Sequence, residues 1–230
     1  MNNEQLSPGP VAGLALARQA IVERSHALWG REIRVLGTGT REQLNAAYSA
    51  ALQRMLPSLP HLGTASHSVL NIDQCVLMND ILIKDILDLA HTMDAHGRSL
   101  MLSLYNPLDA LPGPAERRAM VRQLYKLKDH NGIRLAYDNY TLDTKPGDLL
   151  IDLKLYDYIK MPFPDSALRL SLNTRSDLFN RLYDRMLELI SATRVGFIAD
   201  HVEFSDSAMM AKSLPFEYFQ GGYYSPADRF

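Results

Sequence analysis

The chain has 230 residues, of which 47% are hydrophobic and 22% are charged, and its formal net charge is -2. These values are typical of a globular protein that is long enough to bury one large core. The small net charge argues against nucleic acid as the main partner, although it leaves room for a local basic pocket.

The cysteine count and the hydropathy pattern indicate the cellular compartment in which the protein is expected. Cys75 is the only cysteine, which excludes an internal disulfide and a CxxC metal site. Residues 1–10 are polar and lack the basic and apolar regions of a secretion signal. No apolar run reaches the roughly 18 residues of a membrane span. We therefore expect a cytoplasmic protein without a membrane partner, with a flexible tail over residues 1–10 and one domain over residues 11–230.

Apolar runs with strand character alternate with longer segments of helical period almost to the end of the chain. No low-complexity linker or repeat interrupts this alternation, which indicates a single domain. The predicted strands, in chain order, are Leu14–Ala17, Glu32–Leu36, His67–Ile72, Ser99–Leu104, Ile133–Tyr137, Asp157–Met161, Val195–Ala199 and Glu217–Phe219.

The helices between these strands are marked by apolar stripes and by residues typical of helix ends. One helix is predicted from about Met78 to His96, a second between Gly113-Pro114 and Asn131-Gly132, and a third from Thr174 as its N-cap. The side chains expected to face inward are Ile81, Ile86, Leu89 and Met93 in the first, Met120, Leu124 and Leu127 in the second, and Leu178, Leu182, Met186 and Leu189 in the third.

Strands that alternate with helices favour parallel pairing, either in a closed barrel or in an open doubly wound sheet. Polar residues at or just after five predicted strand ends help to choose between them. In a barrel the carboxyl ends of the strands converge on one face, where such enzymes keep their site. The alternative explanation is that strand ends are polar because loops begin there. The five residues are Asn71, Asp138, Lys160, Asp200 and Gln220.

Several short motifs, in order and at matching spacing, resemble those of the EAL domain family of cyclic di-GMP phosphodiesterases. They span nearly the whole chain: residues 17–22 resemble RQPI, residues 30–34 the Glu-x-Leu-x-Arg motif, residues 133–140 RLALDDF, residues 157–160 DYIK, residues 198–203 IAEGVE and residues 219–225 VQGYLFS. The resemblance implies a single-domain α/β fold, a TIM-like (β/α)8 barrel of the EAL type. Residues 141–143 look closest to EAL domains that precede an HDOD domain, which this chain lacks.

In that family, two divalent metals held by carboxylates and one asparagine activate the attacking water. By position, Glu32, Asn71 and Asp138 match metal ligands, Lys160 matches the conserved lysine, and Asp200 stands for the glutamate of IAEGVE. The resemblance also places Gln19 and Gln220 in the site for cyclic di-GMP.

Four other positions depart from the family pattern: Ser103 and Asn106 stand where glutamates belong, and Asn139 and Pro162 stand where aspartates belong. Asp200 is one methylene shorter than the expected glutamate, and Arg34 and Leu36 disrupt the rest of the Glu-x-Leu-x-Arg motif. Because paired dications need anionic ligands, these losses predict a degenerate site with no catalytic residue, no bound metal and no cofactor. The chain is then not an enzyme.

Three functional hypotheses follow from the resemblance. The leading one is a non-catalytic regulator that acts through protein–protein interaction in bacterial cyclic di-GMP-related signalling, such as motility or biofilm control, with an unidentified protein partner. The second is a receptor that binds cyclic di-GMP without hydrolysing it. The third is a weakly active cyclic di-GMP phosphodiesterase with an altered metal set. A homodimer is a further partner expectation.

Overall fold

The computed structural model describes residues 14–58, 66–105, 113–130, 132–141, 154–163 and 176–229. The expected tail over residues 1–10, the replaced ligand Asn106, the helix stop Asn131 and the N-cap Thr174 lie outside these ranges. Within them, no helix has the length and apolar character needed to cross a membrane.

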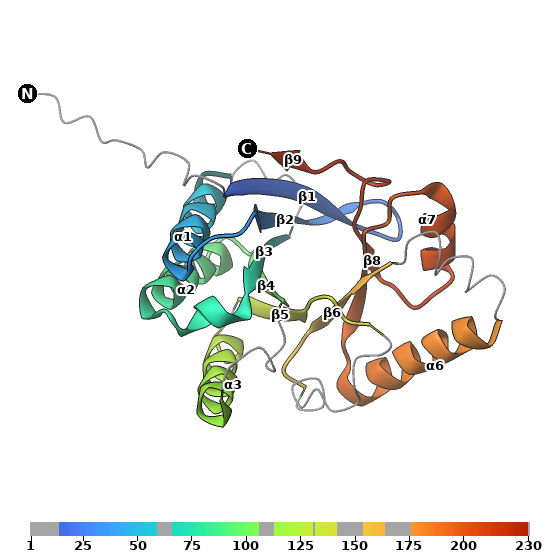
Figure 1. Ribbon diagram of the computed structural model, residues 1–230. Helices are drawn as coiled ribbons and strands as arrows, with labels where there is room; N and C mark the ends of the chain where they lie inside the picture. The colour runs from blue at the N-terminus through green and yellow to red at the C-terminus, as the bar shows by residue number, and fades with distance from the viewer. Residues whose placement is uncertain are drawn as a thin grey trace, which may run out of the picture.

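The strands form a closed barrel with helices around its outside (Figure 1). Neighbouring strands from β2 to β8 pair in parallel and in chain order, and β1 closes the ring by pairing with both β8 and β2. This architecture confirms the predicted TIM-like barrel. The strands are β1 (Ala15–Glu23), β2 (Leu28–Leu36), β3 (His67–Asp73), β4 (Ser99–Tyr105), β5 (Ile133–Tyr137), β6 (Tyr158–Pro162), β7 (Gly196–Asp200), β8 (Tyr218–Phe219) and β9 (Asp228–Arg229).

The first strand departs from the expected parallel arrangement. β1 runs antiparallel to β2 and β8, and the short β9 pairs antiparallel with β1 near the chain end. Only residues 24–27 separate β1 from β2, and Glu23 N donates to Ala27 O at 2.8 Å across this turn. A connection this short can only make a hairpin, because a parallel pair needs a crossover of a dozen or more residues. The prediction of uniformly parallel pairing is therefore wrong for β1.

Helices pack on the outer face of the barrel and bury the larger of two apolar clusters there. The predicted inward stripes are confirmed for Ile86, Leu89 and Met93, whereas Ile81 is wrong, since its side chain is 73% exposed in the first turn of its helix. The helices are α1 (Arg41–Ser58), the 3-10 helix η2 (Gln74–Met78), α2 (Asp80–Asp94), α3 (Pro114–Lys128), α6 (Ser176–Thr193) and α7 (Ser205–Lys212).

The second apolar cluster fills the barrel interior and separates its two ends. Its buried members are Ile21, Trp29, Val69, Met101, Ala136 and Ile198, all strand residues. A β-bulge between β1 and β2 places Trp29 in the amino-terminal mouth, where its ring stacks on His67 at a centroid distance of 4.1 Å. A Cβ on the next residue, Gly30, would lie 3.0 Å from His67 O, so glycine allows this close approach. The chemistry of the opposite, carboxyl-terminal end is thus isolated from this mouth.

Candidate functional site

The polar groups of the carboxyl-terminal end come from strand positions that face the barrel interior. Glu32 and Arg34 lie two residues apart in β2, so both side chains point to the same face of the sheet. Lys160 lies in β6, Asp200 ends β7, and Gln220 directly follows β8. The structure therefore brings together four of the residues predicted from the sequence, together with Arg34.

A hydrogen-bonded network joins these five side chains. The Lys160 ammonium donates to Glu32 Oε1 at 2.6 Å and lies 3.2 Å from Asp200 Oδ2. The Arg34 guanidinium donates through Nε to Glu32 Oε2 and through Nη2 to Asp200 Oδ2, the latter at 2.6 Å. Gln220 Nε2 donates to Glu32 Oε2 at 2.8 Å. Each carboxylate is thus held between the ammonium and the guanidinium.

Burial makes this charge balance necessary. Glu32 and Lys160 are fully buried, and the side chain of Asp200 is 4% exposed. Burial acts to raise the pKa of the Glu32 and Asp200 carboxyls, but the charges of Arg34 and Lys160 outweigh it and hold both pKa values below their usual range. Burial likewise acts to lower the pKa of Lys160, and the surrounding carboxylates raise it above its usual value. All four groups are therefore charged near neutral pH.

Asn71 and Asp138 form a second pair beside the network. Asn71, in β3, donates through Nδ2 to Asp138 Oδ2 just after β5. Burial raises the pKa of the Asp138 carboxyl; the Lys160 charge opposes this rise, and the Glu32 and Asp200 carboxylates add to it. Gln19 pairs with Glu32 in the β1–β2 register, and its side chain donates to Ser225 O at 2.9 Å. Gln19 therefore lies next to the network and also holds the segment after β8.

Comparison with known proteins identifies the fold. No protein-family model and no curated protein sequence matches the chain. Solved structures do match. The EAL domain of Xanthomonas citri FimX in complex with cyclic di-GMP superposes with a TM-score of 0.65 and 13% identity, over 94% of this chain and 88% of that one. The chain has the fold of an EAL domain.

Two further EAL structures agree. The EAL domain of Mycobacterium smegmatis DcpA matches with a TM-score of 0.63 and 15% identity over 93% of this chain and 92% of that one. The cGMP-bound EAL enzyme Bd1971 matches with a TM-score of 0.65 and 14% identity over 94% of this chain. The present chain spans 62% of the length of Bd1971.

Three of the four positions that the sequence comparison with EAL motifs predicts to be replaced fall within the described residues. Ser103 faces Asn71 across the β3–β4 pair, fully buried, and its Oγ has no hydrogen-bond partner there. Asn139 is exposed at φ 57°, and its backbone N donates to Asp138 Oδ1. Pro162 faces Asp200 in the β6–β7 register. None of the three adds a carboxylate to the site.

Sequence reasoning missed the role of Arg34, which it treated only as a disruption of a motif. The sequence did contain a signal for this role. Arg34 lies two residues after Glu32 in a predicted strand, and alternate residues of a strand point to the same face, so the guanidinium and the carboxylate lie on one face. The contact with Asp200 could not be anticipated in this way, because 166 residues separate the two. His201, next to Asp200 in the sequence, is 54% exposed with Nδ1 3.4 Å from Asp200 Oδ2.

The site can therefore offer few free oxygen ligands. Its carboxylates are Glu32, Asp138 and Asp200, and its cations are Arg34 and Lys160. Both Glu32 oxygens and Asp200 Oδ2 already accept from cations or from Gln220. Among the residues described, no three His, Cys, Asp or Glu side chains gather as a metal-binding group.

Proposed function

We propose that this protein is a non-catalytic, degenerate member of the EAL family that acts by binding a protein partner in cyclic di-GMP-related signalling. The fold it shares with EAL domains, some solved with cyclic di-GMP, supports the link to that signalling. The motif order in the sequence supports family membership.

The observation that carries the proposal is the position of the Arg34 guanidinium between Glu32 and Asp200. A binuclear centre needs anionic oxygens with free lone pairs facing two dications. Here the guanidinium and the Lys160 ammonium face those oxygens, and a dication would be repelled by both charges at close range. The residues present do not fit a two-metal site, so we assign no hydrolytic step to the chain.

The carboxyl-terminal face also has an apolar rim suited to a protein partner. Phe204 follows β7 and is 61% exposed, and Tyr223 follows β8 and is 44% exposed. On the far side of the barrel, Met78 and Ile81 follow β3 and are 48% and 73% exposed. Because all three strands are parallel, these side chains lie around the same end of the barrel. Exposed apolar side chains around one end of a barrel supply contacts that a protein partner could bury.

The catalytic part of the proposal is tested by incubating the protein with cyclic di-GMP and Mg²⁺ or Mn²⁺ and quantifying the linear product. We expect no turnover above that of Glu32→Gln, because no pair of metals is held to activate water. Metal-dependent turnover that disappears in Glu32→Gln would overturn the proposal.

The partner is tested by affinity capture with the wild-type chain, an Ile81→Ser/Phe204→Ser double variant, and Leu187→Ser as control. Leu187 is also an exposed apolar residue, 41% accessible, but it lies on the outer helix α6. We expect one partner that the double variant loses and the control keeps. Retention of that partner by the double variant, or its loss in the control, would contradict binding through the carboxyl-terminal face.

A second candidate, a cyclic di-GMP receptor, is favoured by two unsatisfied polar atoms in the barrel. Ser103 Oγ and Gln220 Oε1 are buried without hydrogen-bond partners in the described structure, and a bound ligand would satisfy them. Calorimetric titration with the dinucleotide in metal-free buffer tests this candidate. Saturable heat that Gln220→Ala weakens supports it, and absence of heat at high micromolar concentration removes it.

A further inference from the structure

The amino-terminal mouth of the barrel, on the side away from the network, contains a polar hollow of about 450 Å³. That volume lies in the range of sites for small molecules. Trp29 and the rest of the inner apolar cluster close its inner side, since Tyr158 lines the hollow and packs on Trp29 at a centroid distance of 5.3 Å. The side chains that give the hollow its character are His67, Lys128, Arg134, Lys154, Tyr158 and Arg194.

The hollow has more cations than its acids can pair. Four cations and two carboxylates, Asp157 and Glu217, line it. Asp157 lies 2.5 Å from the Lys128 ammonium and 3.5 Å from the Arg134 guanidinium, so this carboxylate serves two cations. Lys154 and Arg194 form no ion pair with any residue in the described parts of the chain. Although the whole chain has a net charge of -2, this surface is locally basic.

The backbone of these two unpaired cations is unusual. Lys154 has φ 55° and Arg194 has φ 61°, in the left-handed region where a long side chain costs roughly 1–2 kcal/mol. Arg194 directly follows α6, at a position where glycine is the usual residue. A strained cation at each of two segments, 40 residues apart and facing one hollow, indicates a role for the charge itself.

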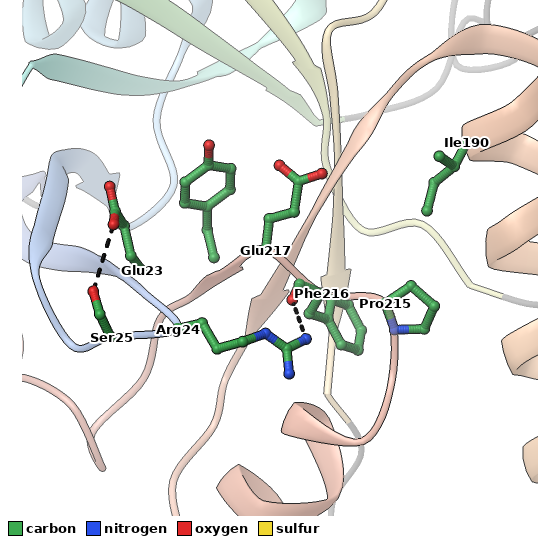
Figure 2. A pocket seen from close by; sticks show the side chains of 8 residues that line it. Glu23, Arg24, Ser25, Ile190, Pro215, Phe216 and Glu217 are labelled. Atoms are coloured by element: carbon green, nitrogen blue, oxygen red, sulfur yellow. Dashed lines mark hydrogen bonds between the residues drawn. The ribbon is translucent and has the colours of Figure 1, made fainter.

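A neighbouring hollow on the same face offers a contrast. In Figure 2 the Arg24 guanidinium lies next to Phe216, joined to its carbonyl by a dashed hydrogen bond, and Glu23 and Glu217 also line this hollow. Glu217 lines both hollows. The Arg24 guanidinium donates to the carbonyls of Lys212, Leu214 and Phe216 at 2.6 to 3.0 Å, so its donors are occupied by the fold. The guanidinium of Arg194 and the ammonium of Lys154 have no such partners among the described residues, which leaves their donors available to a ligand.

We propose that the amino-terminal hollow binds a small molecule carrying a phosphate or diphosphate group, held by Lys154 and Arg194 and flanked by Lys128 and Arg134. A multiply charged oxyanion fits the excess of cations, and guanidinium and ammonium donors form strong charge-assisted hydrogen bonds with phosphate oxygens. Tyr158 and Thr193 add hydroxyl groups to the lining. This site is independent of the function proposed for the opposite end of the barrel.

Pyrophosphate in metal-free buffer is the probe, titrated calorimetrically at constant ionic strength into the wild-type chain, Lys154→Gly and Arg194→Gly. Glycine removes the cation and also accepts the positive φ, so each variant should retain or exceed the wild-type thermal stability. We expect saturable binding by the wild type and affinity about tenfold weaker in each variant. Lys126→Ala is the charge-matched control, since Lys126 is exposed in the same last turn of α3 as Lys128 but does not line the hollow. It should bind like the wild type.

Three results would overturn this assignment. If the cations only offset the carboxyl-terminal dipoles of α3 and α6, pyrophosphate will give no saturable heat with any variant. If a poly-glutamate peptide binds while pyrophosphate does not, the hollow recognises acidic protein segments and the small-molecule assignment is wrong. Equal weakening by Lys126→Ala would likewise contradict a localised site.

Discussion

At the residue scale, Arg34 determines the chemistry of the barrel end. Its guanidinium contacts Glu32 and Asp200 from two different strands, and its own side chain is only 23% exposed. Removing one member of a buried ion network leaves uncompensated charge, which costs more than the network contributes relative to apolar packing. Arg34 therefore stabilises a cluster of carboxylates that would otherwise repel one another.

Arg34→Met is expected to lower the free energy of unfolding by about 3 kcal/mol, because Glu32 and Asp200 then share only Lys160. Urea denaturation at pH 7 measures this loss. Arg34→Lys is the control, since it keeps the charge but loses the forked geometry, and it should lose less. Equal stability of Arg34→Met and the wild type would show that the guanidinium does not hold the carboxylates.

The same variant predicts a pH dependence. The Arg34 charge acts to lower the pKa of Glu32 and Asp200 in the folded state, and both pKa values lie below their ordinary values of 4.5 for Glu and 3.8 for Asp. A lowered folded-state pKa stabilises the fold above the unfolded-state pKa, and this contribution is lost as the pH falls further. Because burial raises both pKa values once the Arg34 charge is removed, the variant takes up protons at higher pH than the wild type, and the stability difference between wild type and Arg34→Met should shrink as the pH falls below neutrality. Denaturation curves that diverge on acidification would contradict this sign.

How far the sequence predicts the site differs from residue to residue. Glu32, Lys160, Asp200 and Gln220 are predicted at the barrel end and do meet there, because parallel strands bring their carboxyl ends together. Which hydrogen bonds these side chains form with one another could not be predicted, because these contacts depend on packing between strands that are distant in the sequence. The basic hollow has no sequence signature, since its cations come from four separate segments and no local pattern connects them.

At the scale of elements, the segment after β8 fixes the geometry of the site. Gly221 has φ 145°, and a Cβ there would lie 2.3 Å from both the N and the O of Val202. Val202 N donates to Gln220 O at 3.0 Å. This contact positions the Gln220 backbone so that its side chain can donate to the Glu32 carboxylate. The predicted final strand, Glu217–Phe219, is close to the observed β8, but the tight contact beyond it leaves no periodic signal in the sequence.

Gly221→Ala is expected to lower the free energy of unfolding by about 3 kcal/mol, through backbone displacement against Val202. Gly97→Ala is the matched control, because Gly97 also has a positive φ, 66°, but no neighbouring atom lies within 4 Å of the position that a Cβ would take there. We expect the control to lose only about 1 kcal/mol. Urea denaturation of both variants measures the difference, and equal losses would show that φ alone is responsible.

At the scale of the whole molecule, the barrel keeps two chemically different ends apart. The inner apolar cluster separates a neutralised, carboxylate-rich end from a basic mouth. The alternation of strands and helices predicts parallel pairing because it requires crossover connections, and among the described strands β2 to β8 it holds, whereas β1 departs from it because a short turn makes a hairpin. The resemblance to EAL domains is what favours the barrel over an open sheet. At one end the carboxylates are paired with Arg34 and Lys160, and at the other Lys154 and Arg194 form no ion pair with any described residue.

The most direct test of the central claim is Mn²⁺ binding to the wild-type chain, followed by electron paramagnetic resonance of the free ion. With Arg34 and Lys160 facing the carboxylates, we predict no stoichiometric Mn²⁺ binding at micromolar concentration. Two Mn²⁺ bound per chain, both lost in Glu32→Gln, would contradict the account.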